Sequence, residues 1–470
     1  MLSLQHTRRD FLRSSVGLAG LTLPTFLKAQ AVSKPRRRKA KACIVIYTWG
    51  GMSHYESFDP KPEAPVDIRG EFKPIKTATP GIQFCEHIPL LAKHSNKLAI
   101  VRSVHHNNGA HSGAVYLNMT GHHPEGQIKA KGRKNWPSIT SVISHFHRPI
   151  AGVPGAVRMP YSMYDNGRQM AGEGAGWLGA KYDPILMRTP AGEPYGGVSR
   201  YDDPALNLKL NLEKERISDR LTLLEQLDQS LGQKVGDSTA YEKLDHYRQM
   251  AADMLLGSPV REAYDLELED QRIRDMYGDH IGGQSLLLAR RLVEAGVPVV
   301  QAVCSAGDLA GGGGDNWDTH RNHFPKMKNR LLPVFDRAVS ALLTDLEMRG
   351  MLDETLVVFL TDFGRTPKVN GNGGRDHHPG VYSMAFAGGG VHGGQVYGAS
   401  DTKGIEPAAG ACSPAACHSC HARSVGPISM RLPLFGLPSS SASPRALSIG
   451  TDGAASALAL AKGMTLRVLL

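Results

Sequence analysis

Residues 335–367, FDRAVSALLTDLEMRGMLDETLVVFLTDFGRTP, contain the pattern that decides the fold. Their first half belongs to a predicted helix over residues 324–349, in which apolar side chains recur at three- and four-residue spacing until Gly350. Residues 355–361 follow as an apolar, β-branched run typical of a buried strand. Asp362 stands at the carboxyl end of this strand, where α/β sheets place their functional sites.

Further segments repeat the buried-strand pattern, with helical segments between them. Strands are predicted at residues 42–50, 97–104, 297–304 and 381–387, with a hairpin or short strand at 392–401. Helical periodicity over about residues 205–292 indicates a helical insertion. We therefore predict one α/β domain over residues 42–408, with a mostly parallel central sheet between helices.

The N-terminus has the features of an export signal. TRRDFLR at residues 7–13 is a twin-arginine signature, and an apolar segment and an AQA cleavage site at residues 29–31 follow it. We expect residues 1–31 to be recognised by the twin-arginine translocon, and the protein to reach the periplasm or the extracellular space. The alternative is a short N-terminal helix. After this leader, no stretch approaches the roughly 20 apolar residues of a membrane helix.

The formal net charge of +10 is concentrated near the N-terminus. The leader contributes +3, and the basic linker over residues 32–41 holds six further positive charges in the sequence KPRRRKAK. Because little net charge is left for the remainder, we expect no nucleic-acid partner. The linker is either a solvated connection or a contact for envelope polyanions.

The composition changes in residues 409–470, which contain one acidic and one aromatic residue. This composition indicates either a disordered tail or a C-terminus replaced by a frameshift. Cys417, Cys420 and His421 form a C-x-x-C-H motif there, the attachment signature of c-type haem. No pattern of haem-burying helices surrounds the motif, so we prefer a chance match to a haem site.

Five carboxylate and imidazole residues gather at predicted strand ends and in Gly/Pro-rich loops: Asp318, His320, Asp362, Asp376 and His377. Such a mixture of ligands suits zinc, manganese, iron or a similar divalent ion. A bound ion could polarise an ester oxygen or lower the pKa of a water nucleophile. Each residue taken singly could instead cap a turn or lie on the surface. For the whole set we expect a divalent metal site.

These segments resemble a known superfamily. The helix–turn–strand unit of residues 335–367 is similar to that of sulfatases and alkaline phosphatases, and LNMTGHHP at residues 117–124 resembles the segment after their nucleophile. A narrower resemblance, to the bacterial exported family called domain of unknown function 1501, covers about residues 1–402. Besides the leader, its motifs are GGMSHYESFDPKPEAP (50–65), GQSLLLARRLVEAGV (283–297), WDTH (317–320), FGRTP (363–367), GRDHHPG (374–380) and AGGGVHGGQVYGASD (387–401).

The resemblance implies an alkaline-phosphatase-like fold and roles for several residues. Asp362 matches the strand-end metal ligand of the superfamily. Asp318 and His320 resemble its earlier Asp/His pair, and His377 or His378 resembles its late histidine.

The sequence also departs from the superfamily pattern. Phe363 stands where a His or Asn ligand is usual, and the first strand ends in Trp49–Gly51 without the usual Asp. His111 occupies the position of the nucleophile, and Ser112 follows one residue later. We expect the attacking group to be either Ser112 or a metal-bound water, with His111 next to it in the active site.

Arg365 and Arg375 are candidates for holding an anionic group, because a guanidinium donates two parallel hydrogen bonds to an oxyanion. Ordinary ion pairing is the alternative for both. Together with His111 and Ser112, Arg365 is also a candidate catalytic residue.

Three functional hypotheses follow. The first is an exported, metal-dependent hydrolase of phosphate or sulfate esters, acting on anionic polysaccharide or envelope material. The second is a non-catalytic binding or assembly protein on a degenerate phosphatase-like scaffold. The third is a haem-carrying electron-transfer protein.

Overall fold

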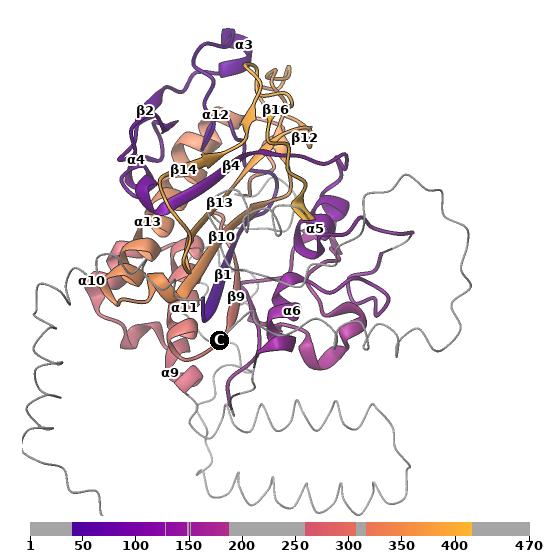
Figure 1. Cartoon of the computed structure of the whole chain (residues 1–470), viewed down its shortest axis with the longest axis vertical. Coiled ribbons are helices and arrows are strands. Elements are labelled where there is room, and N and C mark those ends of the chain that lie inside the picture. The colour runs from indigo at the N-terminus through magenta and orange to yellow at the C-terminus, as the bar shows by residue number, and fades with distance from the viewer. Residues whose placement is uncertain are drawn as a thin grey trace, which may run out of the picture. The chain divides into compact units, whose positions relative to one another are not determined.

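A mostly parallel, eight-stranded sheet forms the centre of the protein (Figure 1). The structure is a computed structural model that describes residues 40–126, 128–147, 150, 152–187, 259–306 and 316–415. The sheet order is β14-β4-β13-β10-β1-β9-β5-β8. The strands are β1 (Ala42–Thr48), β4 (Leu98–Val104), β5 (Val157–Met159), β8 (Ile185–Leu186), β9 (Val299–Val303), β10 (Thr355–Thr361), β13 (Tyr382–Gly388) and β14 (Gln395–Tyr397). Within this sheet only β13 runs antiparallel to its neighbours.

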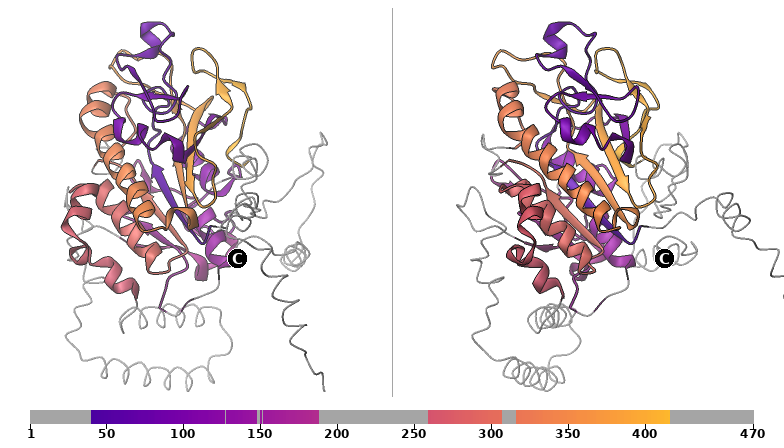
Figure 2. Two further views of the ribbon diagram at one scale, coloured as in Figure 1. Left: turned by 60° about the vertical axis from the view of Figure 1, so that its left-hand side comes forward. Right: turned by 90° about the vertical axis from the view of Figure 1, so that its left-hand side faces the viewer.

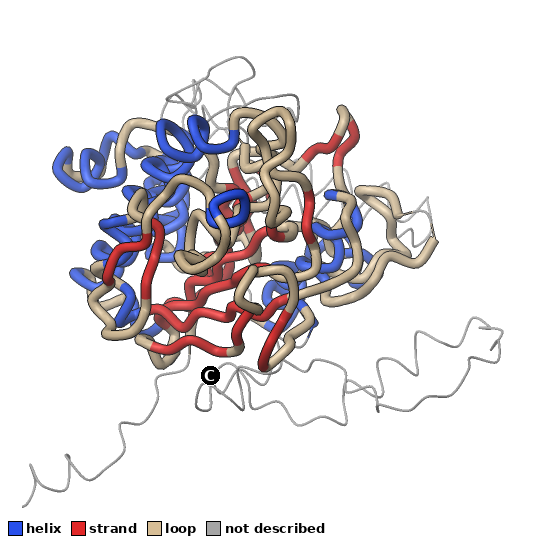
Figure 3. Tube along the Cα trace, turned by 90° about the horizontal axis from the view of Figure 1, so that it is seen from above, coloured by secondary structure: helices blue, strands red, loops and turns tan. Residues whose placement is uncertain are grey.

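Helices cover both faces of the sheet, which is why its central strands are apolar along their whole length (Figure 3). On β1, Ile44 and Ile46 pack in one core with side chains of α11 (Ile281–Glu294) and α13 (Leu332–Met348). The alternate residues Val45 and Tyr47 pack in a second core with side chains of α5 (His111–Thr120) and α6 (Ile139–Phe146). The period-two alternation of a strand therefore divides its side chains between two cores.

Shorter elements surround these layers (Figure 2). The other α-helices of the described residues are α3 (Val66–Arg69), α4 (Pro89–Ala92), α9 (Pro259–Tyr264), α10 (Gln271–Tyr277) and α12 (His323–Lys326). Two-stranded ribbons pair β2 (Pro74–Lys76) with β3 (Gln83–Cys85), β6 (Tyr164–Asp165) with β7 (Arg168–Gln169), β11 (Gly364–Arg365) with β12 (His377–His378), and β15 (Ala399–Ser400) with β16 (Pro407–Ala409). Single 3₁₀ turns occupy Ser95–Lys97, Gly176–Leu178, Ala180–Tyr182, Leu266–Leu268 and Leu352–Glu354.

The predicted α/β class and the mostly parallel sheet between helices are confirmed. The predicted helix over residues 324–349 is present in three parts, α12, a π-helical segment (Met327–Leu331) and α13. Pro333 in the first turn of α13 has no N–H, so the regular α-helical hydrogen bonds cannot continue through this point. The sequence did not predict α5: eight of its ten residues are buried, so it lacks the one-sided apolar pattern of a surface helix.

The ends of the expected domain and insertion also differ from the described structure. Cys412 is buried, forms an isolated bridge with Val104 and exchanges backbone hydrogen bonds with Ser103 and His105, so packing continues past the expected boundary at residue 408. Helices α9, α10 and most of α11 lie in the part of the expected insertion that follows residue 258, and α11 packs on the sheet as part of the core. The leader, most of the basic linker and residues 205–258 lie outside the described residues. In the described part of the chain, no helix is long and apolar enough to span a bilayer.

Candidate metal centre

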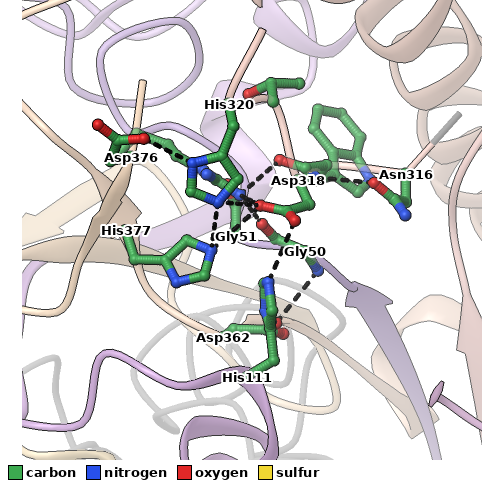
Figure 4. A network of polar contacts seen from close by, with 12 residues as sticks. Gly50, Gly51, His111, Asn316, Asp318, His320, Asp362, Asp376 and His377 are labelled. Atoms are coloured by element: carbon green, nitrogen blue, oxygen red, sulfur yellow. Dashed lines mark hydrogen bonds and ion pairs between the residues drawn. The ribbon is translucent and has the colours of Figure 1, made fainter. Parts of the chain in front are cut away.

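Four carboxylate and imidazole side chains meet at the carboxyl ends of the central strands (Figure 4). Asp362 directly follows β10, and Asp318 lies in the connection that follows β9. His111 is the first residue of α5, in the connection that follows β4, and His377 is the first residue of β12. The parallel direction of β4, β9 and β10 brings these connections to one edge of the sheet.

Asp318 is the centre of this group. Its Oδ1 atom lies 3.1 Å from Nε2 of His320 and 3.1 Å from Nε2 of His377. Its Oδ2 atom lies 3.4 Å from Nε2 of His111. Burial disfavours the charged carboxylate, but the hydrogen bonds of the three histidines and the charge of Arg365 outweigh burial and hold the pKa of Asp318 well below its usual range.

His111 joins Asp318 to Asp362. Its Nδ1–H donates to Oδ2 of Asp362 over 2.6 Å, and the backbone N–H of Gly50 donates to the same oxygen over 3.2 Å. Burial disfavours a charged ring, but hydrogen bonds to the Asp318 and Asp362 carboxylates prevail and raise the pKa of His111 to about 9. Without a further cation, His111 is therefore protonated at neutral pH.

The other two histidines are oriented by groups behind them. Nδ1–H of His320 donates to Oδ1 of Asp376 over 2.6 Å, and Nδ1–H of His377 donates to the carbonyl of Gly109 over 2.7 Å. In the tautomer with the proton on Nδ1, each Nε2 atom would present its lone pair to a cation. These two Nε2 atoms lie 2.9 Å apart. A carboxylate or carbonyl behind a ligating histidine is the usual support of a metal site.

The residues present fit a divalent cation. One ligand atom from each of His111, Asp318 and His377 lies within 4.8 Å of the others, which suits ligands that surround one ion at about 2.0–2.3 Å. Oδ1 of Asp362 is buried and has no hydrogen-bond partner among the described residues, and Nε2 of His111 has only the 3.4 Å contact with Asp318. Buried polar atoms in this state are costly unless a ligand satisfies them. Asp376 supports His320 from its far side, which differs from its predicted role as a ligand.

The surroundings of Arg365 do not fit the anion-binding and catalytic roles expected for it, and these expectations need correction. The side chain is fully buried. Its donors are taken by the carbonyls of Gly50, Gly51, Trp317 and Arg375 and by Oδ1 of Asp318. Arg365 therefore ties the end of β1 to the Asp318 connection and to the segment before Asp376.

Arg375 is also fully buried, so its predicted anion-binding role is corrected in the same way. Its guanidinium donates to the carbonyls of Ile68, Thr366 and Pro367 and to Oε1 of Glu56 over 2.8 Å. The other oxygen of Glu56 lies 3.0 Å from Nε2 of His323, whose Nδ1 is 2.6 Å from the hydroxyl of Thr319.

The support from Glu56 and His323 was missed at the sequence level. Glu56 lies within the motif of residues 50–65, and His323 lies three residues after the WDTH motif. Residue type alone does not reveal that both side chains are buried.

Ser112 is half-buried in the first turn of α5, and its hydroxyl makes no hydrogen bond with the described residues. Phe363 is fully buried, with its ring centroid 5.0 Å from that of His111 and 4.3 Å from that of His377. An apolar wall thus occupies the position expected for a further ligand.

Gly50 gives a physical reason for the missing first-strand carboxylate. It has φ of +106°, and a Cβ atom built there would lie 2.5 Å from the backbone nitrogen of Asp318. The close approach of these two segments leaves no room for a side chain. The haem candidates Cys417, Cys420 and His421 lie outside the described residues.

The chain is similar to several solved structures at low sequence identity. A sulfatase, PsFucS1 from Pseudoalteromonas sp., has 15% identity and a TM-score of 0.32, over 86% of this chain and 70% of the sulfatase. A mutant of the TAB5 alkaline phosphatase with Mg bound has 10% identity and a TM-score of 0.33, over 79% of this chain and 96% of that enzyme. Ps i-CgsB has 11% identity and a TM-score of 0.36, over 81% of this chain and 70% of that chain.

No curated protein matches the sequence. The family model described as "Protein of unknown function (DUF1501)" matches residues 40–430, which include every residue of the centre described above. The match extends beyond the change of composition near residue 410. The chain therefore belongs to the DUF1501 family.

Proposed function

We propose that this protein is a metal-dependent hydrolase of phosphate or sulfate esters, exported by the twin-arginine route. The observation that carries the proposal is the position of the Asp318 cluster at the start of α5. His111, a member of the cluster, is also the first residue of that helix. A cation site therefore lies at a helix N-terminus, and each of the two would attract an anionic ester.

The start of α5 is suited to an oxyanion. Its N-cap residue, Ala110, provides no side-chain hydrogen bond to the first turn. The first N–H groups of a helix have no partner within the helix, and together with the helix dipole they favour a negative charge. This N-terminus takes the role that the sequence had suggested for Arg365 and Arg375, whose donors are used inside the protein.

The attacking group in this proposal is a water molecule. A divalent ion held by Asp318, His111 and His377, with Asp362 beside them, would polarise the ester and lower the pKa of the attacking water. His111 and His377 must be neutral at Nε2 to hold it, and the groups behind their Nδ1 atoms favour that tautomer. The hydroxyl of Ser112 lacks a hydrogen-bonded base among the described residues, which argues against a covalent intermediate.

Polymeric anionic material, either polysaccharide or an envelope ester, is the substrate class that fits an exported enzyme of this kind. Its only expected protein partner is the translocon during export.

A second candidate function is a non-catalytic, metal-stabilised binding or assembly protein. Phe363 favours it, because this buried ring contacts both His111 and His377 and narrows the space beside the ion. Gly50 favours it as well, since the close backbone contact there excludes a first-strand carboxylate.

Hydrolysis of 4-nitrophenyl phosphate and 4-nitrophenyl sulfate separates the two candidates. The protein loaded with a divalent metal should release nitrophenol, and Asp318→Asn should stop this release while the protein stays folded by circular dichroism. Ser112→Ala should keep the rate within about threefold, and a complete loss would instead indicate a serine nucleophile. A folded wild-type protein that holds metal but hydrolyses neither ester would support the binding protein.

A further inference from the structure

An aromatic and cationic surface lies beyond the other end of α5, where the chain leaves that helix. It consists of His122, Trp136 and Trp177 together with Lys129, Lys131 and Lys134, and it is called here the distal surface. None of these residues takes part in the metal centre. The length of α5 separates the two sites by about 15 Å, at 1.5 Å per residue for its ten residues.

The aromatic rings of the distal surface are stacked in an ordered way. The rings of His122 and Trp136 are parallel, with centroids 3.7 Å apart and an interplanar angle of 5°. Trp177 meets Trp136 edge to face at 5.9 Å and leaves 47% of its own surface exposed. An exposed tryptophan face with a negative quadrupole attracts the slightly positive C–H groups of a sugar ring.

The segment that carries the lysines is fixed rather than loosely attached. The backbone N–H of Trp136 donates to the hydroxyl of Tyr116 on α5 over 2.8 Å, and that of Trp177 donates to the carbonyl of Asn135 over 3.1 Å. Arg133 forms two hydrogen bonds with Asp183, which accepts another from the backbone of Ala175. Such a preformed surface loses little conformational entropy when a ligand binds.

Close backbone contact fixes the position of Trp177 as well. A Cβ atom on Gly176, which has φ of +50°, would lie 2.0 Å from the carbonyl oxygen of Asn135. The two segments that bear the tryptophans can therefore touch only because Gly176 has no side chain.

The three lysines of the distal surface form no ion pair within the described residues. Residues 128–136 contain four cationic side chains and no acidic one, although the charge of Glu125 acts on His122. Arg133 is used by Asp183, but Lys129, Lys131 and Lys134 are exposed and form no ion pair with any described residue. Since these three exposed lysines lie within six residues of the chain and pair with no described carboxylate, an anionic partner would be attracted to this segment.

We infer that the distal surface binds an anionic polysaccharide, with a sugar ring against Trp177 and its sulfate or phosphate groups near the three lysines. The inference rests on the proposed function for its biological setting, because it names the substrate class of that hydrolase. A linear polymer is long enough to lie on the distal surface and also reach the metal centre, whereas a nitrophenyl ester is not. The surface thus distinguishes polymeric from small substrates.

Binding of dextran sulfate to the full chain tests this inference without any hydrolysis, with neutral dextran and single-stranded DNA as comparison ligands. The wild-type protein should bind dextran sulfate more tightly than either comparison ligand. Trp177→Ala should weaken that binding about tenfold, or about 1.4 kcal/mol. The triple variant K129Q/K131Q/K134Q should weaken it further and reduce its dependence on salt.

Matched controls separate the distal surface from other exposed aromatic and basic groups. Phe146→Ala removes an exposed aromatic ring on α6, and Lys328→Gln removes an exposed lysine elsewhere; both should bind as the wild type does. Replacing Arg36, Arg37 and Arg38 by Gln measures the share of the basic linker, and the loss caused by Trp177→Ala should persist in that background.

Equal affinity of wild type and Trp177→Ala for dextran sulfate, with both proteins folded, would overturn the inference. Equal affinity for single-stranded DNA and dextran sulfate would overturn it too, because the surface would then bind any polyanion and not specifically a polysaccharide. Absence of ester hydrolysis with normal binding would remove the proposed function and leave the binding surface in place. Hydrolysis of nitrophenyl esters without polysaccharide binding would do the reverse.

Discussion

The imidazole of His111 donates from Nδ1 to Oδ2 of Asp362 over 2.6 Å, although 251 residues separate them in the sequence. His111 follows β4 and Asp362 follows β10, and the antiparallel strand β13 lies between these two strands. The contact therefore spans β13 and joins the start of α5 to the carboxyl end of β10. It gives the cluster a histidine that is held by a buried carboxylate and faces Asp318 with its other nitrogen.

This arrangement makes metal affinity depend on pH. In the metal-free protein the pKa of His111 is raised to about 9 from an ordinary value of 6.5, and a ligating nitrogen must lose its proton. Affinity for a divalent metal should therefore rise by up to about tenfold per pH unit between pH 7 and pH 9 and level off above that. Calorimetric titration at several pH values measures this rise and the proton released.

The stability of the metal-free protein should change in the opposite direction. Because the folded pKa of His111 exceeds its unfolded value, its contribution to stability is fully present below about pH 6.5 and is lost as the pH rises through 9. His111→Gln should flatten both pH profiles. A metal affinity that is constant from pH 7 to pH 9 in the wild type would show that His111 is not a ligand.

Gly50→Ala should damage the metal centre through the backbone. The new Cβ would lie 2.5 Å from the nitrogen of Asp318, and the residue would keep φ of +106°. We expect a loss of about 2–4 kcal/mol in the free energy of unfolding, and weaker metal binding because the Asp318 segment must move. Chemical denaturation and metal titration measure the two effects.

Gly81→Ala is the matched control, since Gly81 has φ of +84° with nothing within 4 Å of a built Cβ. It should cost about 1 kcal/mol from backbone strain alone and leave metal affinity unchanged. Equal effects of the two substitutions on metal binding would contradict the close contact between Gly50 and Asp318.

Arg365→Lys should lower the free energy of unfolding, and its effect should not be confined to substrate affinity. The guanidinium satisfies four carbonyls and the Asp318 carboxylate from a fully buried position, and an ammonium group cannot reach all of them. The expected loss is about 2–4 kcal/mol in the free energy of unfolding.

The exposed Arg272, which pairs with Asp270, is the comparison, and Arg272→Lys should change stability by less than about 0.5 kcal/mol. If Arg365→Lys kept wild-type stability and raised only KM, Arg365 would instead be an anion-binding residue in solution.

Asp376→Asn should weaken the metal centre without removing it. Asp376 is half-exposed and touches the cluster only through Nδ1 of His320, so its loss frees one ring rather than a central ligand. Loss of a group directly behind a ligand reduces metal affinity by about 10- to 100-fold. Because Asp376 acts through His320, which contacts the ligand Asp318, we expect the lower end of that range, about tenfold. Competition with a chelator of known affinity measures the change, and no change at all would mean that His320 is not part of the centre.

The sequence predicted the sheet better than the site. β1, β4, β9, β10 and β13 were each predicted within two residues at either end, because strands buried on both faces are continuous apolar runs. Burial also explains why α5 was not predicted, because Gly113 and Val115 are buried in it just as His111 is. A helix surrounded by protein has no polar face to give it a period.

Within the site, the sequence identified residue types but not their surroundings. Asp318, His320 and His377 do converge, yet Arg365 and Arg375 look the same in sequence whether they face solvent or lie buried. Their burial depends on carbonyls contributed by distant loops. His111 was noticed only for its place in a motif, and its neighbours Asp318 and Asp362 became evident from the fold of the chain.

Elemental analysis of the purified, exported protein tests the central claim most directly. The wild-type protein should contain about one equivalent of a divalent metal, and Asp318→Asn should contain almost none, because it alters the carboxylate that contacts all three histidines. The variant should remain folded by circular dichroism, so that loss of metal is not loss of structure. A folded wild-type protein without any divalent metal, and unable to take one up after addition, would contradict the account.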